Sequence, residues 1–238
     1  MSSERDTGGP GGAPPTLPPA TTQERLVAST RELLWERGYV GTSPKAILQH
    51  AGVGQGSMYH HFTGKSDLAL AAIRRTAEEM TAAAERIFSG PGTAYDRIAA
   101  YLLREREVLR GCPIGRMAQD RDVVRDPALR QPLDEMFAWL RRRLADVLDE
   151  GRAAGELAAG LDPEATAASV AAVVQGGYVL ARAAEDTAPF DAAVRGLLAL
   201  LAAQTATGTP PVATGTASVA TGTAPVSAGA PPASRPAR

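Results

Sequence analysis

The chain has 238 residues, of which 44% are hydrophobic and 21% charged, with one cysteine and a formal net charge of −1. A single cysteine excludes an intramolecular disulfide framework and any zinc site built from several cysteines. The length allows one or two domains with a sizeable core, and the near-zero net charge gives no sign of a nucleic-acid partner for the chain as a whole.

Glycine and proline are concentrated at the two ends of the chain. Residues 1–20 hold four Gly and five Pro, and residues 205–238 hold four Gly and six Pro. Neither stretch has enough apolar side chains to offset the entropy lost on folding, so we expect two disordered tails. No apolar segment near the start suits a secretory signal, and the longest uncharged helical window, 165–181, is short and polar for a membrane span. We therefore expect a cytoplasmic protein without a membrane partner.

Residues 21–204 show helical periodicity almost throughout. Ser43 followed by Pro44 is a typical helix start, and Ser66–Asp67 are expected to cap a long fourth helix. No alternating apolar and polar run has the length of a strand, so we expect an all-α fold. The expected helices cover about residues 26–37, 44–51, 55–62, 66–88, 94–110, 115–122, 130–154, 162–186 and 188–204.

The segment 42–62 carries the most informative pattern. Two short helices are joined by a tight turn over 51–54, with glycines where a positive φ is needed. This is the plan of a helix-turn-helix, whose second helix lies in the major groove of DNA. The outer face of that helix is polar, while Met58 and Phe62 on its inner face point to a core. Hydroxyl, amide and imidazole groups on the outer face can contact phosphates or base edges.

A set of landmarks at fixed spacing extends this pattern over residues 33–68. The landmarks are Gly38-Tyr39, Thr42-Ser43, Ile47, Ala51-Gly52-Val53, Gly56-Ser57-Met58-Tyr59, His61-Phe62, Lys65 and Leu68. They resemble the N-terminal domain of the TetR family of transcriptional repressors. The resemblance implies a three-helix DNA-binding domain over 21–68, and a larger helical domain over 69–204 that binds a ligand and dimerises.

The same resemblance suggests which side chains contact DNA. It implies that Gln55 contacts a base or the backbone, and that phosphates are bound by Thr42, Ser57, Tyr59, His60 and Lys65. The chain departs from the family at Gly54, where a Ser usually caps the recognition helix, at Gln55, where a cation is common, and at Pro44, which replaces an aliphatic residue. The expected DNA-binding residues are Thr42, Ser43, Lys45, Gln55, Gly56, Ser57, Tyr59, His60 and Lys65.

Charge by segment gives the DNA-binding hypothesis weak support. Residues 21–70 hold five basic and four acidic side chains, whereas residues 71–204 hold 17 Arg and 20 acids. Two other functions find less support. The glycines 52, 54 and 56 follow a helix rather than a strand, which argues against a dinucleotide site. The three histidines and Cys112 lack the spacing of metal ligands, so neither a metal nor a cofactor is expected.

The second half of the chain suggests an effector site. Gly111-Cys112-Pro113-Ile114-Gly115 resembles an element in one subgroup of the family's C-terminal domains. Cys112 is either a small buried residue or, if its thiolate is accessible, a sensor of oxidants or electrophiles. A pocket between the later helices would suit an apolar or aromatic effector. Its expected lining is Tyr101, Cys112, Met117, Met136, Phe137, Trp139, Gln175 and Tyr178.

The last two helices suggest a homodimer. Ala168, Ala172 and Gly176 recur at every fourth position, and the final helix has more apolar width than one amphipathic stripe needs. A four-helix bundle between two copies explains this better than a helix buried within the monomer. The arginines 141–143 are expected to be solvated, but because three consecutive helical residues point in three directions they are not expected to form one patch. The resulting hypothesis is a homodimeric repressor that binds a palindromic DNA operator and is not an enzyme. Two alternatives are a Cys112-based sensor on the same scaffold and a helical small-molecule-binding protein that does not bind DNA.

Overall fold

The computed structural model describes residues 21–205, and the expected tails at 1–20 and 206–238 lie outside this range. Within it the chain is helical, with no β-sheet and one isolated bridge between Leu157 and Thr205. The all-α expectation is confirmed. The helices are α1 (Thr22–Arg37), α2 (Pro44–Ala51), α3 (Gln55–His61), α4 (Lys65–Phe88), α5 (Ala94–Leu103), α6 (Pro113–Met117), α7 (Arg121–Arg125), α8 (Pro127–Ala153), α9 (Pro163–Ala184) and α10 (Ala188–Ala202).

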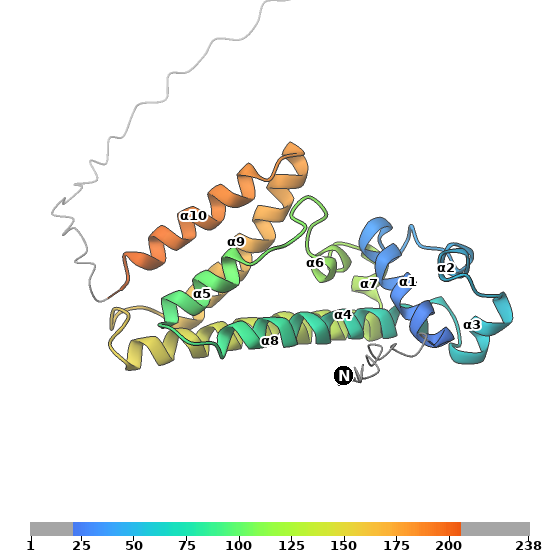
Figure 1. Ribbon diagram of the computed structural model, residues 1–238, viewed down its shortest axis with the longest axis horizontal. Helices are drawn as coiled ribbons and strands as arrows, with labels where there is room; N and C mark the ends of the chain where they lie inside the picture. Colours follow the sequence, from blue (N-terminus) through green and yellow to red (C-terminus); the bar gives the residue numbers. More distant parts are fainter. Residues whose placement is uncertain (1–20, 206–238) are drawn as a thin grey trace, which may run out of the picture.

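Helices α1, α2 and α3 form a small bundle at one end of the elongated molecule (Figure 1). Ser43 begins α2 as expected, since its hydroxyl accepts a hydrogen bond from the Ala46 amide at 3.2 Å. Gly52 ends α2 in the left-handed conformation, with φ of 63°. Buried apolar side chains fill the space between the helices. They are Leu26, Leu33, Ile47, Met58, Phe62 and Leu68.

The rest of the described chain forms a larger helical body. Helices α4 and α8 lie along each other for much of the length of the molecule, and α9 and α10 pack together against α8 and α5 (Figure 1). Leu68 near the start of α4 belongs to the core of the small bundle, whereas Ala69 and the turns that follow belong to the core of the body. Helix α4 is therefore shared by the two parts and connects them rigidly.

The structure corrects several expected helix limits. The helix expected over 94–110 ends at Leu103, because Arg104 turns to an extended conformation with ψ of 149°. The single helix expected over 115–122 is wrong. Two short helices replace it, with Cys112 and Asp120 at their N-caps.

Two helix starts also differ from expectation. Gly64, not the Ser66–Asp67 pair, is the N-cap of α4, and Asp67 instead accepts a hydrogen bond from the Thr63 amide at 3.0 Å. Helix α8 begins at Pro127 rather than at 130, because Asp126 caps it through the amide of Ala128. Asp and Ser side-chain oxygens accept hydrogen bonds from the free amides of a first helical turn. Several neighbouring positions in this chain can supply such an oxygen, so the helix start differs from the expected one.

By length and composition alone, helix α9 could cross a bilayer, since its mean hydropathy is 1.2. It is the one such helix in the part of the chain that the structure describes. It packs against α8 and α10, as a helix of the body does. A core helix of a soluble protein passes the same test, so this finding is weak evidence for a membrane segment.

Candidate DNA interface and effector site

The recognition helix candidate, α3, is held by its apolar side. Met58 is fully buried and Phe62 is 6% exposed, both in the core of the small bundle. The opposite side carries Gln55, Gly56 and His60, all exposed, and Tyr59, which is 55% exposed. A large aromatic side chain with a hydroxyl is thus presented to solvent beside polar groups, an arrangement suited to phosphate and base-edge contacts.

The other predicted DNA contacts lie around the same helix pair. Ser43 and Lys45 are exposed at the start of α2, and Ser57 is half-buried on α3. The structure brings these residues to the α2–α3 end of the molecule. Gly54 caps α3 without a side-chain hydrogen bond, as the departure from the family pattern implied.

Thr42 departs from the expectation. Its side chain is 1% exposed, and its hydroxyl donates to the Gly38 carbonyl at 2.7 Å. Its amide donates to the Tyr39 carbonyl. Since both donors are used within the loop, Thr42 holds the loop before α2 and offers no free side-chain donor to a phosphate.

Lys65 is half-buried, which limits its access to DNA. Its ammonium lies 4.0 Å from the centre of the Tyr39 ring, a cation–π contact. Burial lowers the pKa of Lys65, and the charges of Asp120 and Asp122 oppose this shift. The side chain therefore also links α4 to the end of α1.

A set of polar contacts between α1 and the segment 104–120 joins the small bundle to the body. The Trp35 indole Nε1 donates to the Gly111 carbonyl at 2.9 Å. The Arg110 guanidinium lies 3.8 Å from the centre of the Trp35 ring and pairs with Glu32. The sequence favours a packing or partly exposed role for Trp35 over a ligand contact, and its spacing does not show which carbonyl its indole contacts.

A second group of contacts lies at the loop after α1. The Asp120 carboxylate accepts hydrogen bonds from the amides of Tyr39, at 2.9 Å, and Val40, at 3.2 Å. Arg116 donates to the Glu36 carbonyl at 3.0 Å. Sequence reasoning missed Asp120, although its position before a short helix marks it as a cap. The segment 104–120 is thus attached to α1 and the loop after it at two places, through Arg110 and Gly111 in its middle and through Arg116 and Asp120 near its end.

Seven of the eight expected effector-site residues lie around one cavity of the body. It is bounded by α4, α5, α8 and α9, and Met80, Ala84, Arg104, Leu140 and Val174 complete its lining. Its volume is only about 20 Å³, so it holds about one water molecule. Met117 does not line it and is instead buried in the core of the body. The expected lining exists, but side chains fill the space that an effector would need. The seven residues are Tyr101, Cys112, Met136, Phe137, Trp139, Gln175 and Tyr178.

Cys112 lies where this cavity meets two larger ones. One, of about 460 Å³, is lined by Trp35, Arg104 and Arg106 among others, and the other, of about 310 Å³, by Arg116 and Arg182 among others. The thiol sulfur accepts a hydrogen bond from the Gly115 amide at 3.3 Å, and Cys112 is 7% exposed. No group of three or more His, Cys, Asp or Glu within residues 21–205 is arranged to hold a metal ion.

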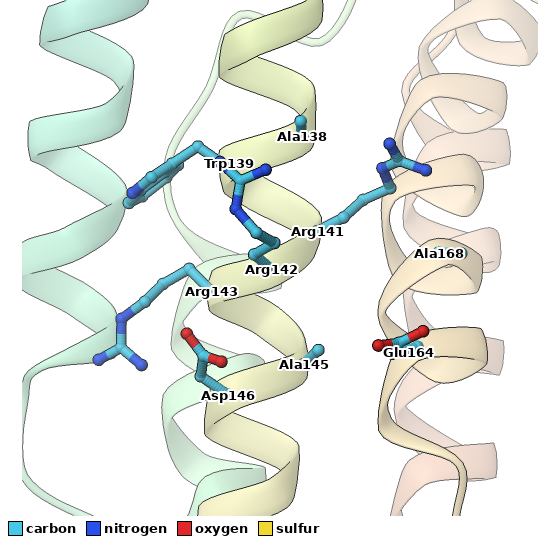
Figure 2. A pocket seen from close by; sticks show the side chains of 9 residues that line it. All are labelled: Ala138, Trp139, Arg141, Arg142, Arg143, Ala145, Asp146, Glu164 and Ala168. Atoms are coloured by element: carbon cyan, nitrogen blue, oxygen red, sulfur yellow. The ribbon is translucent and has the colours of Figure 1, made fainter.

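As expected, the three consecutive arginines of α8 do not form one patch. Figure 2 shows Arg141 reaching toward α9 while Arg143 points to the opposite side of α8. Arg143 is partly buried and pairs with Glu85, at 3.1 Å, and Glu150. Arg141 and Arg142 are exposed beside a surface cavity of about 710 Å³. The expectation of a solvated side chain is therefore wrong for Arg143.

The outer side of α9 and α10 is apolar and exposed. Ala168, Ala172 and Gly176 are exposed along α9. Val179 and Leu180 are 52% and 55% exposed. Leu200 on α10 is 70% exposed. Their neighbours Val174, Leu197 and Leu201 point into the core instead. The small-residue positions are thus on the surface of the monomer.

Comparison with known families gives two matches that follow the two parts of the structure. Residues 26–72 match the family described as bacterial regulatory proteins, tetR family. Residues 93–197 match the tetracyclin repressor-like C-terminal domain.

Individual relatives and solved structures match over most of the chain. The transcriptional regulator AcuR of Cereibacter sphaeroides is 29% identical over 167 residues, which are 67% of this chain and 74% of AcuR. The crystal structure of a regulatory protein TetR from Rhodobacter sphaeroides is similar with a TM-score of 0.68 and 26% identity, covering 75% of this chain and 97% of that one. The reduced form of E. coli NemR, at 24% identity, shares the fold with a TM-score of 0.66, covering 74% of this chain and 94% of that one.

Proposed function

Since the chain belongs to the TetR family of bacterial transcriptional regulators, we propose that it is a homodimeric repressor released from a palindromic DNA operator by a small-molecule effector. The observation that carries the proposal is the exposed polar side of α3, set on a helix-turn-helix within the matched residues 26–72. The DNA-binding domain would cover 21–68 and the effector-binding and dimerisation domain 69–204. We expect no enzymatic activity and a cytoplasmic location.

Footprinting on the DNA upstream of the chain's own gene tests the DNA-binding part. Gln55→Ala removes an exposed amide at the start of α3, and we expect weaker operator binding. Gln131→Ala is the matched control, because Gln131 is exposed on α8 and contacts Glu135. Protection of two half-sites about one helical turn apart supports the proposal. Absence of any sequence-specific protection at controlled salt would contradict it and favour a ligand-binding protein without DNA activity.

The exposed apolar side of α9 and α10 supports the homodimer. Two helices with small residues on one surface can approach the same pair of a second copy closely, around a two-fold axis. A Cβ added at Gly176 would meet no atom within 4 Å, so Gly176→Glu should leave the monomer folded and disrupt the dimer. Gly160→Glu is the control, because Gly160 has equal space in the loop before α9. A dimer that persists in Gly176→Glu at low micromolar concentration would contradict this interface.

Release from DNA would use the contacts between α1 and the segment 104–120. Gly111 and Arg116 contact α1 and also line the cavities around Cys112. An effector that binds one arrangement of this segment better than another would shift the population of dimers with correctly spaced recognition helices.

A Cys112 sensor is a second candidate for the signal. Cys112 borders the three cavities of about 20, 310 and 460 Å³, so a small reactive molecule in any of them would lie near the thiol. Cys112→Ser keeps the small polar cap of α6. If an oxidant or electrophile still releases this variant from the operator as it releases the wild type, the thiol is not the sensor.

A further inference from the structure

The partly buried arginines of residues 21–205 fall into two groups. Four of them form ion pairs with glutamates. They are Arg31 with Glu79, Arg97 with Glu150, Arg110 with Glu32, and Arg143 with Glu85. Within the same described range, the other three form no ion pair. They are Arg104, Arg106 and Arg116.

All three unpaired arginines border the cavities around Cys112. Arg104 and Arg106 line the cavity of about 460 Å³, and Arg116 lines that of about 310 Å³ together with the exposed Arg182. The carboxylates among the lining residues are Glu105 and Glu107, both exposed. Glu107 is 3.6 Å from Arg110. Taken together, the two cavities are lined by four arginines and two glutamates, while the cavity of about 460 Å³ by itself has two of each.

Arg106 and Arg116 are partly buried, and each has a donor that makes no hydrogen bond within residues 21–205. The Nη2 of Arg106 donates to the Tyr101 carbonyl at 2.5 Å and its Nε to the Arg104 carbonyl at 3.3 Å. Its Nη1 is buried without a partner in the described chain. Burial lowers the pKa of Arg106, the nearby charge of Arg104 adds to this, and Tyr178 opposes it. Burying a guanidinium without a carboxylate is costly, so a bound anion would offset a penalty already present in the fold.

The same place offers apolar surface for the rest of a ligand. The Arg104 guanidinium lies 4.1 Å from the centre of the Tyr101 ring, and Tyr101 and Arg104 also line the small closed cavity with Met136 and Trp139. A molecule with its acidic end at the arginines would have its apolar end at this closed cavity, which must open to admit it.

We propose that the effector is an organic anion whose carboxylate or phosphate binds Arg104 and Arg106 and whose apolar part enters between α4, α8 and α9. The proposal rests on the proposed function for the ligand's role as effector. The arginines lie at the start of the segment 104–120, a few residues before Arg110 and Gly111, which contact Trp35 of α1. An anion bound there would act directly on the segment that joins the two parts of the molecule.

Thermal unfolding of the full chain without DNA tests the site. The probes are sodium octanoate, sodium benzoate and octyl phosphate, with octanamide and benzamide as neutral counterparts. The variants are Arg106→Gln and the control Arg86→Gln, which removes an equal charge from an exposed position on α4. We expect at least one anion to raise the Tm of the wild type and of Arg86→Gln more than the neutral amide does, with octanamide compared with octanoate and octyl phosphate, and benzamide with benzoate. In Arg106→Gln the anion should bind about tenfold more weakly or worse, since a hydrogen bond to a charged group is lost.

The comparison within the panel identifies the acidic group. Stabilisation by octanoate or benzoate alone indicates a carboxylate, and by octyl phosphate alone a phosphate. Three results would overturn the proposal. The acids and the amides could stabilise the protein equally, the anion could stabilise Arg106→Gln as much as the wild type, or no anion could stabilise the wild type. If anions bind through Arg106 but the protein does not bind an operator, the repressor function is contradicted and the anion site is still supported. Operator binding without any anion effect would contradict the site alone.

Discussion

Two glycines of the turn between α2 and α3 allow a matched test of how backbone conformation sets stability here. Gly52 has φ of 63° and Gly54 has φ of −75°. A Cβ added at either position would meet no atom within 4 Å, so steric space does not distinguish them. The same substitution, Gly to Ser, should therefore have opposite effects at the two positions.

At Gly54 serine should stabilise the protein. With ψ of 159° the residue already has the extended conformation of an N-cap, and a serine oxygen could accept a hydrogen bond from the first turn of α3. The cap contributes about a few tenths of a kcal/mol over glycine. The reduced entropy of the unfolded chain adds roughly 0.4–1 kcal/mol. We expect a gain of about 0.5–1.5 kcal/mol in the free energy of unfolding.

At Gly52 serine should destabilise the protein. The left-handed conformation costs a residue with a Cβ about 1–2 kcal/mol, which exceeds the entropic gain. For a chain of this size, 1 kcal/mol corresponds to roughly 2–4 °C in Tm. The change in Tm relative to the wild type should therefore be positive for Gly54→Ser and negative for Gly52→Ser. Hydrogen exchange of the α3 amides should slow in Gly54→Ser and accelerate in Gly52→Ser.

Equal shifts of the same sign in both variants would refute this reasoning, because they would mean that side-chain polarity rather than φ decides the outcome. A rise in Tm for Gly54→Ser without slower exchange in α3 would refute the cap as its cause.

Three further results are expected. Trp35→Phe removes the hydrogen bond to the Gly111 carbonyl and should lower the free energy of unfolding by about 1 kcal/mol in urea titrations, and unchanged stability would contradict a role for this bond. Gly177→Ala should cost about 1–3 kcal/mol in the same assay, because its Cβ would lie 2.8 Å from the Phe190 ring. Hydrogen bonds from the Thr93 hydroxyl and amide lower the pKa of Asp96 below its usual 3.8, so this stabilisation is present at neutral pH and is lost as pH falls through the lowered pKa. Thr93→Ala should accordingly lose less stability on acidification, and an identical acid profile would contradict the assignment.

The local parts of the fold were predictable from sequence because their causes are local. Ser43 before Pro44 determines the start of α2, and Gly52 its end, through contacts within a few residues. The all-α class followed from periodicity in the same way. The helix expected over 94–110 was too long because the backbone leaves the helical conformation at Arg104, whose guanidinium packs over the Tyr101 ring.

A local loop contact at Thr42 and contacts distant in sequence elsewhere explain the remaining differences. Thr42 matched a family position for DNA contact, yet its hydroxyl donates to the Gly38 carbonyl. The lining of the small cavity was largely foreseen from large side chains in the later helices, whereas its volume was not, since packing is a property of the assembled body. Unpaired Arg106 could not be recognised from sequence either, because ion pairing depends on which helices meet.

The closed cavity between α4, α5, α8 and α9 has a consequence for the dose at which this regulator responds. Since the side chains that would line an effector fill the space themselves, only the fraction of molecules that has opened can bind. The apparent dissociation constant is then the intrinsic one divided by that fraction. If the chain is the effector-released repressor proposed above, it would stay on its operator at low effector concentrations, and substitutions that shrink Met136 or Trp139 should lower the threshold concentration for induction without any new contact to the ligand.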